Sequence, residues 1–418
     1  MRVTALEKSQ PSREQVVRRL ALEVSAIHAR VPRISPFVGL LYDRSLVGPL
    51  ERVTAPPYDT VLTEERRRLL DASPHNIVRL DLGEDLPGDD DVENKYRRAA
   101  REFERWRDEG VLIPTPAPSY FAYEMRFAFQ GRHRSVRGLV CLVRLEDWGG
   151  SIVPHERTMR GPVEDRLRLM RALRANLSSI YLVCSGPCSG LTDLLDDARG
   201  TDPLASLVDE AGVEHRMWRV DGAHDGVESL RSQSMMIADG HHRYTMALRY
   251  RDEMRERHGS GPWDEVMALV VDAVTEDPPV LPIHRVLVSG DPPVRGERVR
   301  DLAEVLEEVD DRDLVYGTVA REDGELVHRV DRLEGRPPVV CTLHAEILDR
   351  LTPAIAYTPD AALAEEEVRR GGATAAFLLP PTTATRIRSV VDRGERLPQK
   401  STYFWPKPRT GMVIRPLE

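Results

Sequence analysis

Asp239 is followed by a glycine, two histidines and an arginine at residues 240–243. Two imidazoles and a guanidinium supply hydrogen-bond donors that suit phosphate oxygens. A glycine lets an anion come close to the backbone, because it has no side chain. These residue types in this order predict a nucleotide-phosphate site formed by Asp239, Gly240, His241, His242 and Arg243. The alternative is a polar helix cap with incidental histidines.

The flanking residues predict how that segment is positioned. Residues 234–238 are apolar and predict a strand, and residues 242–258 predict a helix that begins at once. The N-terminus of a helix has unpaired N–H groups and the positive end of the helix dipole. We therefore expect a strand–turn–helix junction that presents both to a phosphate.

A second cluster begins with His155 and Glu156, followed by Thr158 and then by Glu164 and Asp165. A histidine beside a carboxylate, with a hydroxyl close behind, can supply a general base or a magnesium ligand. A solvated loop leading into a capped helix is an equally good interpretation of these residues.

A third cluster lies near the C-terminus, where Lys400 and Lys407 are two of the four lysines in the chain. A lysine can act as a point charge on a phosphate, so Lys400 is a candidate phosphate ligand. The alternative is a surface lysine.

Composition excludes several classes of function. The chain has 418 residues, a net charge of −9 and a pI near 5.8, which argues against general nucleic-acid binding. No lysine stands in a Walker-A setting, so a P-loop kinase or ATPase is excluded. No apolar run is long enough to span a bilayer and we find no signal peptide, so we expect a cytoplasmic protein without membrane contact.

The remaining periodicities predict the surrounding architecture. Helices are expected over residues 13–30, 91–108, 160–175 and 297–309, a hairpin over 120–145, and strands over 36–42, 77–82, 180–184, 266–274 and 338–343. Because strands and helices alternate irregularly, we expect a multi-domain α/β (mixed α+β) protein with mixed sheets. The predicted divisions are an N-terminal helical extension at 1–32, a main α/β domain at 33–290 with the phosphate site, and a smaller α/β region at 291–418 packing on it.

Several sequence blocks, in order, resemble the DUF1015 family from about residue 36 to residue 417. The blocks are APPYDT (55–60), NIVRLDL (76–82), PHERT (154–158), EDRLRL (164–169), IADGHHRY (237–244), LPIHR (281–285) and LPQKSTYFWPK (397–407). The helix before residue 33 has no counterpart in this resemblance.

The resemblance extends to chemistry. The Gly-His-His-Arg element is similar to the phosphate-binding Gly-x-x-Arg of the ParB/sulfiredoxin-like superfamily, whose members bind CTP, ATP or ADP, and free L-serine kinases carry a similar Asp-Gly-His-His-Arg. The resemblance therefore implies a ParB/sulfiredoxin-like core in which residues 239–243 hold the phosphates of ATP or ADP. It also implies a glutamate base, for which Glu156 is the candidate.

Two functional hypotheses follow. The first is a kinase that moves the γ-phosphoryl group of ATP to a small hydroxyl substrate, with free L-serine as a candidate acceptor. Glu156, His155 and His241 would be catalytic, and Mg²⁺ would have Glu164, Asp165 or Asp239 as ligands. The second is a ParB-like nucleotide-binding regulator or scaffold without turnover.

Two further interpretations are weaker. Sulfiredoxin-like repair needs a cysteine in the turn, where this chain has histidines. A zinc hydrolase using His155, His241 and His242 lacks a helical histidine pair. The acceptor, the preferred nucleotide and the oligomeric state are not readable from the sequence.

Overall fold

The computed structural model describes residues 32–158, 160–184, 186–222, 224–231, 233–290, 295–351 and 354–418. The helix predicted for residues 13–30, and all but the last residue of the predicted extension, lie outside these ranges. None of the helices in the described ranges is long and apolar enough to cross a membrane.

The larger sheet has nine strands within the described residues, in the order β6-β11-β8-β12-β5-β4-β10-β9, with β1 against β5. Parallel pairs, β11 with β6 and β12 with β8, occur beside antiparallel ones. The predicted mixed α/β class is therefore confirmed. The strands are β1 (Ile34–Ser35), β4 (Tyr120–Phe129), β5 (Arg132–Arg144), β6 (Ile152–Pro154), β8 (Ile180–Cys184), β9 (Ala205–Val208), β10 (Glu214–Val220), β11 (Met235–Asp239) and β12 (Glu265–Val271).

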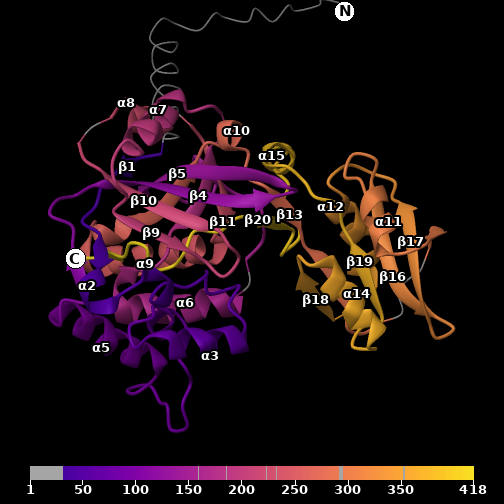
Figure 1. The fold of residues 1–418 in the computed structure, drawn as a ribbon, viewed down its shortest axis with the longest axis horizontal. Coiled ribbons are helices and arrows are strands. Elements are labelled where there is room, and N and C mark those ends of the chain that lie inside the picture. The colour runs from indigo at the N-terminus through magenta and orange to yellow at the C-terminus, as the bar shows by residue number, and fades with distance from the viewer. Residues whose placement is uncertain are drawn as a thin grey trace, which may run out of the picture.

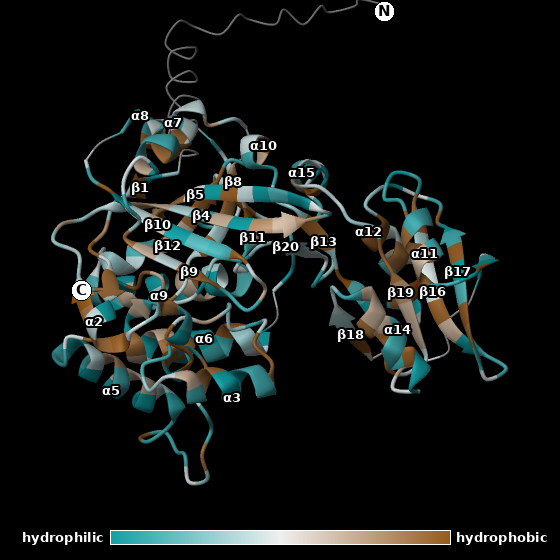
Figure 2. Ribbon diagram, viewed as in Figure 1, coloured by the Kyte–Doolittle hydropathy of each residue, from teal (hydrophilic) through white to brown (hydrophobic). Residues whose placement is uncertain are grey.

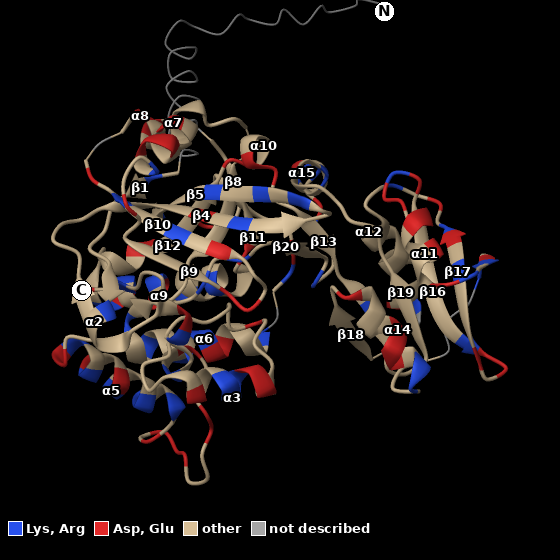
Figure 3. Cartoon of the chain, in the orientation of Figure 1, with Lys and Arg blue, Asp and Glu red and all other residues tan. Residues whose placement is uncertain are grey.

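Helices cover both faces of this sheet (Figure 1). On one side lie α3 (Thr63–Ala72), α5 (Lys95–Asp108), α6 (Arg160–Leu173) and α9 (His241–His258). The short helix α4 (Val78–Asp81) contacts α3 and α5. On the other lie α7 (Ser189–Ala198), α8 (Asp225–Arg231) and α10 (Ala273–Glu276). The outer helices α3 and α5 are mostly hydrophilic (Figure 2), and both carry positively and negatively charged residues (Figure 3). Helix α9 packs Met246 and Tyr250 against Leu167 of α6, which fixes its N-terminus relative to the sheet.

A smaller sheet has the order β15-β17-β16-β19-β14-β18 within the described residues. Its strands are β14 (His284–Leu287), β15 (Glu297–Val299), β16 (Val315–Glu322), β17 (Glu325–Arg332), β18 (Ile355–Thr358) and β19 (Ala375–Leu378). Helices α11 (Leu302–Glu308) and α14 (Ala361–Arg369) pack on it through Val305, Ala364 and Val368. Beside this sheet lie α12 (Val339–Leu343), the π-helix His344–Leu348, α13 (Asp349–Leu351) and α15 (Ala384–Asp392).

The last residues of the chain return to the larger body (Figure 1). β20 (Thr402–Phe404) pairs with β13 (Val280–Pro282), and β21 (Arg415–Pro416) pairs with β7 (Ala175–Asn176). The Trp405 ring packs 4.5 Å from that of Phe127 in β4. β2 (Leu40–Tyr42), which pairs with β3 (Leu112–Pro114), forms a bridge to Ile414, and Arg415 donates to the Pro262 carbonyl in the 3₁₀ turn Pro262–Asp264. α2 (Arg44–Val47) and the 3₁₀ turn Leu50–Arg52 follow β2 in the chain. The C-terminal residues thereby reach the end of β11, where Lys407 donates to Asp239.

Some predicted elements were wrong. Residues 77–82 and 338–343, predicted as strands, contain the short helices α4 and α12. The Asn76 side chain accepts from the Val78 N–H at 3.0 Å, and the Asp311 side chain accepts from the Val339 N–H at 2.8 Å. Side-chain acceptors at a first turn favour a helix over a strand.

Two other predicted elements differ from the structure in their bounds. The predicted helix 297–309 is a strand followed by helix α11. The predicted strand over residues 36–42 is limited to the three residues of β2.

Candidate functional site

The turn between β11 and α9 brings the predicted phosphate residues together. β11 ends at Asp239, Gly240 has left-handed backbone angles of φ 93° and ψ 25°, and α9 begins at His241. A Cβ atom on Gly240 would lie 3.0 Å from the Arg243 guanidinium, so both conformation and space favour glycine. Helical bonding starts with the Tyr244 N–H, which donates to the Gly240 carbonyl at 2.9 Å. The earlier N–H groups of α9 have no acceptor within the helix, as in helix-terminal anion sites.

The buried Arg243 side chain binds groups around this turn. Its Nη1 donates to Ser178 Oγ at 2.8 Å and to the Ser179 carbonyl at 2.6 Å, and its Nη2 donates to Asp239 Oδ2 at 2.7 Å. Its Nε is buried without a hydrogen-bond partner among the described residues. Since two of its three nitrogens bind protein groups, Arg243 is suited to hold the turn in shape.

Asp239 is enclosed by cations. The Lys407 ammonium donates to Asp239 Oδ1 and lies 3.8 Å from Asp59 Oδ2. Burial alone would raise the pKa of Asp239, but Lys407 and Arg243 hold that pKa below its usual range. Burial works against the charge of Lys407, but Asp239 and Asp59 raise its pKa above the usual value. Asp239, Lys407 and Arg243 therefore form a buried cluster of charged side chains behind the turn.

A cavity of about 370 Å³ adjoins the turn, which is within the size range of small-molecule sites. Its walls come from segments far apart in the sequence. They are Tyr58, Asp59, Thr60 and Leu62; Glu156; residues 238–243; Ile283; Tyr357, Thr358, Pro359 and Leu363; and Lys400, Thr402, Tyr403 and Lys407. The structure thus joins residues 239–243 with Glu156 and Lys400, from all three predicted clusters.

His241 faces this cavity, whereas His155 lies behind it. The fully buried His155 donates from Nδ1 to the Ile237 carbonyl at 2.6 Å, and its Nε2 accepts from Thr402 Oγ at 2.7 Å. Its backbone N–H points to His241 Nε2 at 3.3 Å. Burial lowers the pKa of His155 to about 4 and that of His241 well below its usual value. His155 thus holds Thr402 and a neutral His241 in place rather than facing a substrate.

His242 and Lys400 complete the polar side of the cavity. His242 is partly buried, and its pKa is lowered first by that burial and then by the nearby Lys400 charge. The Lys400 backbone has a positive φ of 56°, which turns its N–H toward the Glu156 carboxylate. The Lys400 ammonium group and the His242 ring therefore lie on the same wall of the cavity.

Glu156 is a cavity carboxylate whose acidity is weakened by burial. Its Oε1 accepts from the Lys400 N–H at 2.6 Å and its Oε2 from the Ser401 N–H at 3.4 Å. Burial nevertheless raises its pKa to about 7, against the lowering effect of those hydrogen bonds. A carboxylate with this pKa is a stronger base than an ordinary glutamate and exchanges protons near neutral pH.

The candidate magnesium ligands are not brought together. Glu164 of α6 pairs with Arg168 at 3.4 Å, and Asp165 binds Arg166 at 2.9 Å, both outside the walls of the cavity. Both Asp239 oxygens are bound by Lys407 and Arg243. Among the described residues no group of three or more His, Cys, Asp or Glu side chains is arranged to hold a metal ion. The predicted ligand set therefore does not fit a resident Mg²⁺.

Sequence reasoning missed part of the site. Tyr58 and Asp59 belong to a Pro-rich turn that would be read as purely structural, yet both line the cavity. The Tyr58 ring packs 4.4 Å from the guanidinium carbon of Arg166, whose Nη1 binds buried Asp81 at 2.7 Å. Tyr357 comes from the smaller sheet, and no local pattern in the sequence links it to residue 240.

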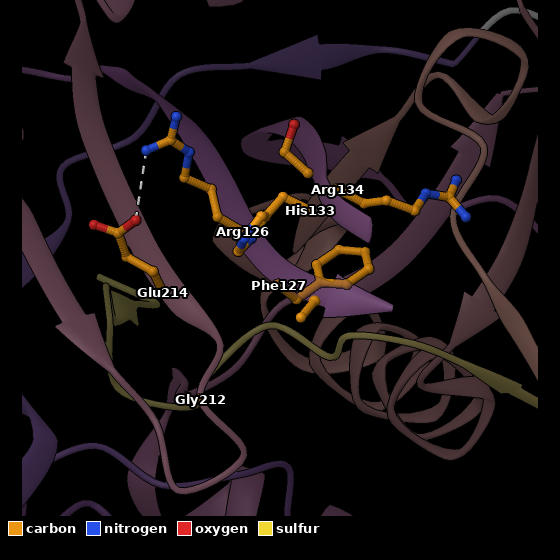
Figure 4. Close-up of a pocket in the computed structure, with 8 residues that line it drawn as sticks. Arg126, Phe127, His133, Arg134, Gly212 and Glu214 are labelled. Atoms are coloured by element: carbon orange, nitrogen blue, oxygen red, sulfur yellow. Dashed lines mark ion pairs between the residues drawn. The ribbon is translucent and has the colours of Figure 1, made fainter. Parts of the chain in front are cut away.

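A second cavity, of about 560 Å³, lies at the end of the β4–β5 hairpin. Arg126, His133 and Arg134 project around it, and Arg126 pairs with Glu214 at 3.6 Å (Figure 4). Arg134 also donates to the Asp277 carbonyl at 2.5 Å. This cavity contains none of the residues predicted from the motifs.

Comparison of the sequence with models of known protein families identifies the family of this chain. The model of a family described as protein of unknown function (DUF1015) matches residues 34–341, which is more than half of the chain. The chain belongs to the DUF1015 family. This confirms the membership predicted from the sequence blocks. No curated protein matches this DUF1015 chain in sequence.

Solved structures with weak similarity to this DUF1015 protein include three of interest. A free serine kinase in complex with AMP is 16% identical, with a TM-score of 0.36 over 65% of this chain and 92% of its own. A conserved hypothetical protein from Pyrococcus furiosus is 15% identical, with a TM-score of 0.34 over 64% and 93%. SbnI with a C-terminal truncation, from Staphylococcus aureus, is 13% identical, with a TM-score of 0.35 over 65% and 85%. At these TM-scores none of the likenesses bears on the chemistry of the cavity.

Proposed function

We propose that this protein is a nucleotide-dependent kinase that phosphorylates the hydroxyl group of a small molecule, with free L-serine as a candidate. One observation carries the proposal. Glu156, a carboxylate whose pKa is raised to about 7, shares a cavity with a helix N-terminus preceded by a left-handed glycine. Phosphoryl transfer needs a phosphate cradle and a base for the attacking hydroxyl, and the cavity has a candidate for each.

The phosphates of ATP or ADP would lie over Gly240, at the N-terminus of α9. The first N–H groups of the helix, the neutral His241 ring and the His242 ring would donate to phosphate oxygens, and Lys400 would add a positive charge. Arg243 would act by holding the turn, because its Nη atoms already bind Ser178, Ser179 and Asp239.

Glu156 would act as the general base. As the acceptor oxygen attacks the terminal phosphorus, its proton passes to Glu156 and the bond from phosphorus to the bridging oxygen breaks. The nucleotide leaves with one phosphate fewer, as ADP from ATP or AMP from ADP. His155, which donates from Nδ1 to the Ile237 carbonyl, would orient Thr402 through Nε2 and His241 through its backbone N–H.

Magnesium would arrive with the nucleotide as a metal–phosphate complex rather than as a resident ion. Mg²⁺ in such sites binds substrate phosphates and one or two carboxylates. Asp59 is the best placed of the cavity carboxylates, because 26% of its side chain is exposed, against 13% for Asp239. Glu164 and Asp165 are not assigned to this role.

The proposal is tested by incubating the purified protein with Mg²⁺, ATP or ADP, and L-serine, L-threonine or L-homoserine. We expect ³¹P NMR to show a new phosphomonoester with at least one acceptor, and no such signal with L-alanine, which lacks only the hydroxyl of serine. Nucleotide binding without a product from a broader panel of alcohols would instead support the regulator hypothesis. No nucleotide binding at all would contradict both.

A further inference from the structure

The cavity beside Gly240 combines two kinds of surface. Its polar wall is the β11–α9 turn with Lys400 and Lys407, all on the larger body. Its apolar wall contains Leu62, Ile283, Pro359 and Leu363. Leu62 and Leu363 are 75% and 49% exposed, so this wall presents apolar surface that a ligand can cover. A ligand that fills the cavity must therefore have one anionic part and one part that is flat or apolar.

Tyr357 forms part of the same wall and has a fixed ring. It lies on β18, where it is paired with Arg285 of β14, and the Arg285 guanidinium carbon lies 5.6 Å from the ring centroid. Arg285 is fully buried and donates to the Ile283 carbonyl and to His344 Nε2 at 3.3 Å, so it supports the ring from within the protein. A held aromatic ring in a ligand cavity is suited to stacking with another planar ring.

The main chain of β18 adds hydrogen-bonding groups. In the described part of the smaller sheet β18 is an edge strand, paired only with β14. The backbone groups on its other edge have no strand partner, and Tyr357 and Thr358 at that strand line the cavity. The rim of a nucleobase carries both donors and acceptors that can pair with such an edge.

We propose that the smaller sheet supplies a nucleobase subsite, in which the base of the bound nucleotide stacks on Tyr357 beside Leu363 and Leu62 and meets the edge of β18. This deepens the proposed function and rests on it. A small hydroxyl substrate has too little apolar surface to account for this wall, whereas a nucleobase matches both its flatness and its mixed polarity. The nucleotide would then bridge the larger body and the smaller sheet.

The subsite is tested by calorimetric titration of the full chain, in Mg²⁺, with two probes that share the phosphates: ATP and inorganic tripolyphosphate. We expect Leu363→Ser and Tyr357→Ala each to weaken ATP binding about tenfold while leaving tripolyphosphate binding unchanged. Tyr357→Phe keeps the ring and should bind ATP as the unaltered protein does. Leu306→Ser is the matched control, because Leu306 is a 44% exposed leucine on α11, outside the cavity walls.

The results separate the subsite from the function it rests on. Unchanged ATP affinity in both Leu363→Ser and Tyr357→Ala would overturn the subsite while the phosphate site stands. Equal weakening of both probes in Leu363→Ser, a surface substitution, would also overturn it. Failure of the unaltered protein to bind either probe would overturn the proposed function itself.

Discussion

At the scale of single residues, the account depends on Glu156 as the group that accepts the hydroxyl proton. We expect Glu156→Gln to lower kcat at least about 100-fold, the usual loss when a general base is removed, with little change in nucleotide affinity. Glu164→Gln is the matched control, because this carboxylate lies on α6 outside the cavity. Steady-state kinetics with calorimetry for each variant measures both effects, and equal kcat values for the two variants would remove Glu156 from the mechanism.

The raised pKa of Glu156 also predicts a pH dependence of turnover. Because a base must be unprotonated, kcat should rise with pH through about 7 and then level off. Rates measured between pH 5.5 and 8.5 at saturating substrates give this profile. A rate already at its plateau at pH 5.5 would mean that another group accepts the proton.

The same raised pKa has an opposite consequence for stability. A carboxyl whose pKa is higher in the folded than in the unfolded chain stabilises the fold while protonated, and that contribution is lost as pH rises toward and through about 7. We expect the Tm of Glu156→Gln to exceed that of the unaltered protein by more at pH 8 than at pH 5.5. A Tm difference that does not vary with pH would contradict the burial of this charge.

At the scale of elements, the turn between β11 and α9 needs glycine for its conformation and for the space beside Arg243. Gly240→Ala should lower the free energy of unfolding by about 1–2 kcal/mol and also weaken nucleotide binding. Gly259→Ala is a matched control at the other end of α9, with a φ of 76° and no atom within 4 Å of the added Cβ. Chemical denaturation should show backbone strain in both variants, and calorimetry should show a binding defect in Gly240→Ala alone.

The sequence predicted secondary structure best for segments whose apolar pattern matches the residues that are buried in the structure. The strand 180–184 and the helix after Gly240 follow from apolar runs and from glycine itself, and both are present. The strand predictions at 77–82 and 338–343 were wrong because the Asn76 and Asp311 side chains accept from the first N–H groups of short helices, which apolar runs alone cannot reveal. Residues 239–243 and 156 could be singled out by type, but Tyr357 and Asp59 join them only through tertiary packing.

At the scale of the whole molecule, the C-terminal segment reaches the site through Lys407, which pairs with Asp239 and lies near Asp59. We expect Lys407→Met to lower the free energy of unfolding by about 2 kcal/mol, because it removes one cation that pairs with buried Asp239. A buried charge that loses every partner costs roughly 3–5 kcal/mol. The loss here is smaller because Arg243 still pairs with Asp239. Lys95→Met is the control, since its pairs with Asp85 and Asp165 are partly exposed and should contribute under about 1 kcal/mol. Urea denaturation of both variants gives the comparison.

The cavity also depends on how the two sheets meet. The larger body provides the turn, Glu156 and both lysines, while the smaller sheet provides Tyr357 and α14 provides Leu363. A structure of the protein with Mg²⁺ and a non-hydrolysable ATP analogue tests this arrangement most directly. The account predicts phosphate oxygens within hydrogen-bonding distance of the first N–H groups of α9, with the base on the Tyr357 ring. An analogue bound elsewhere, or phosphates turned away from Gly240, would contradict it.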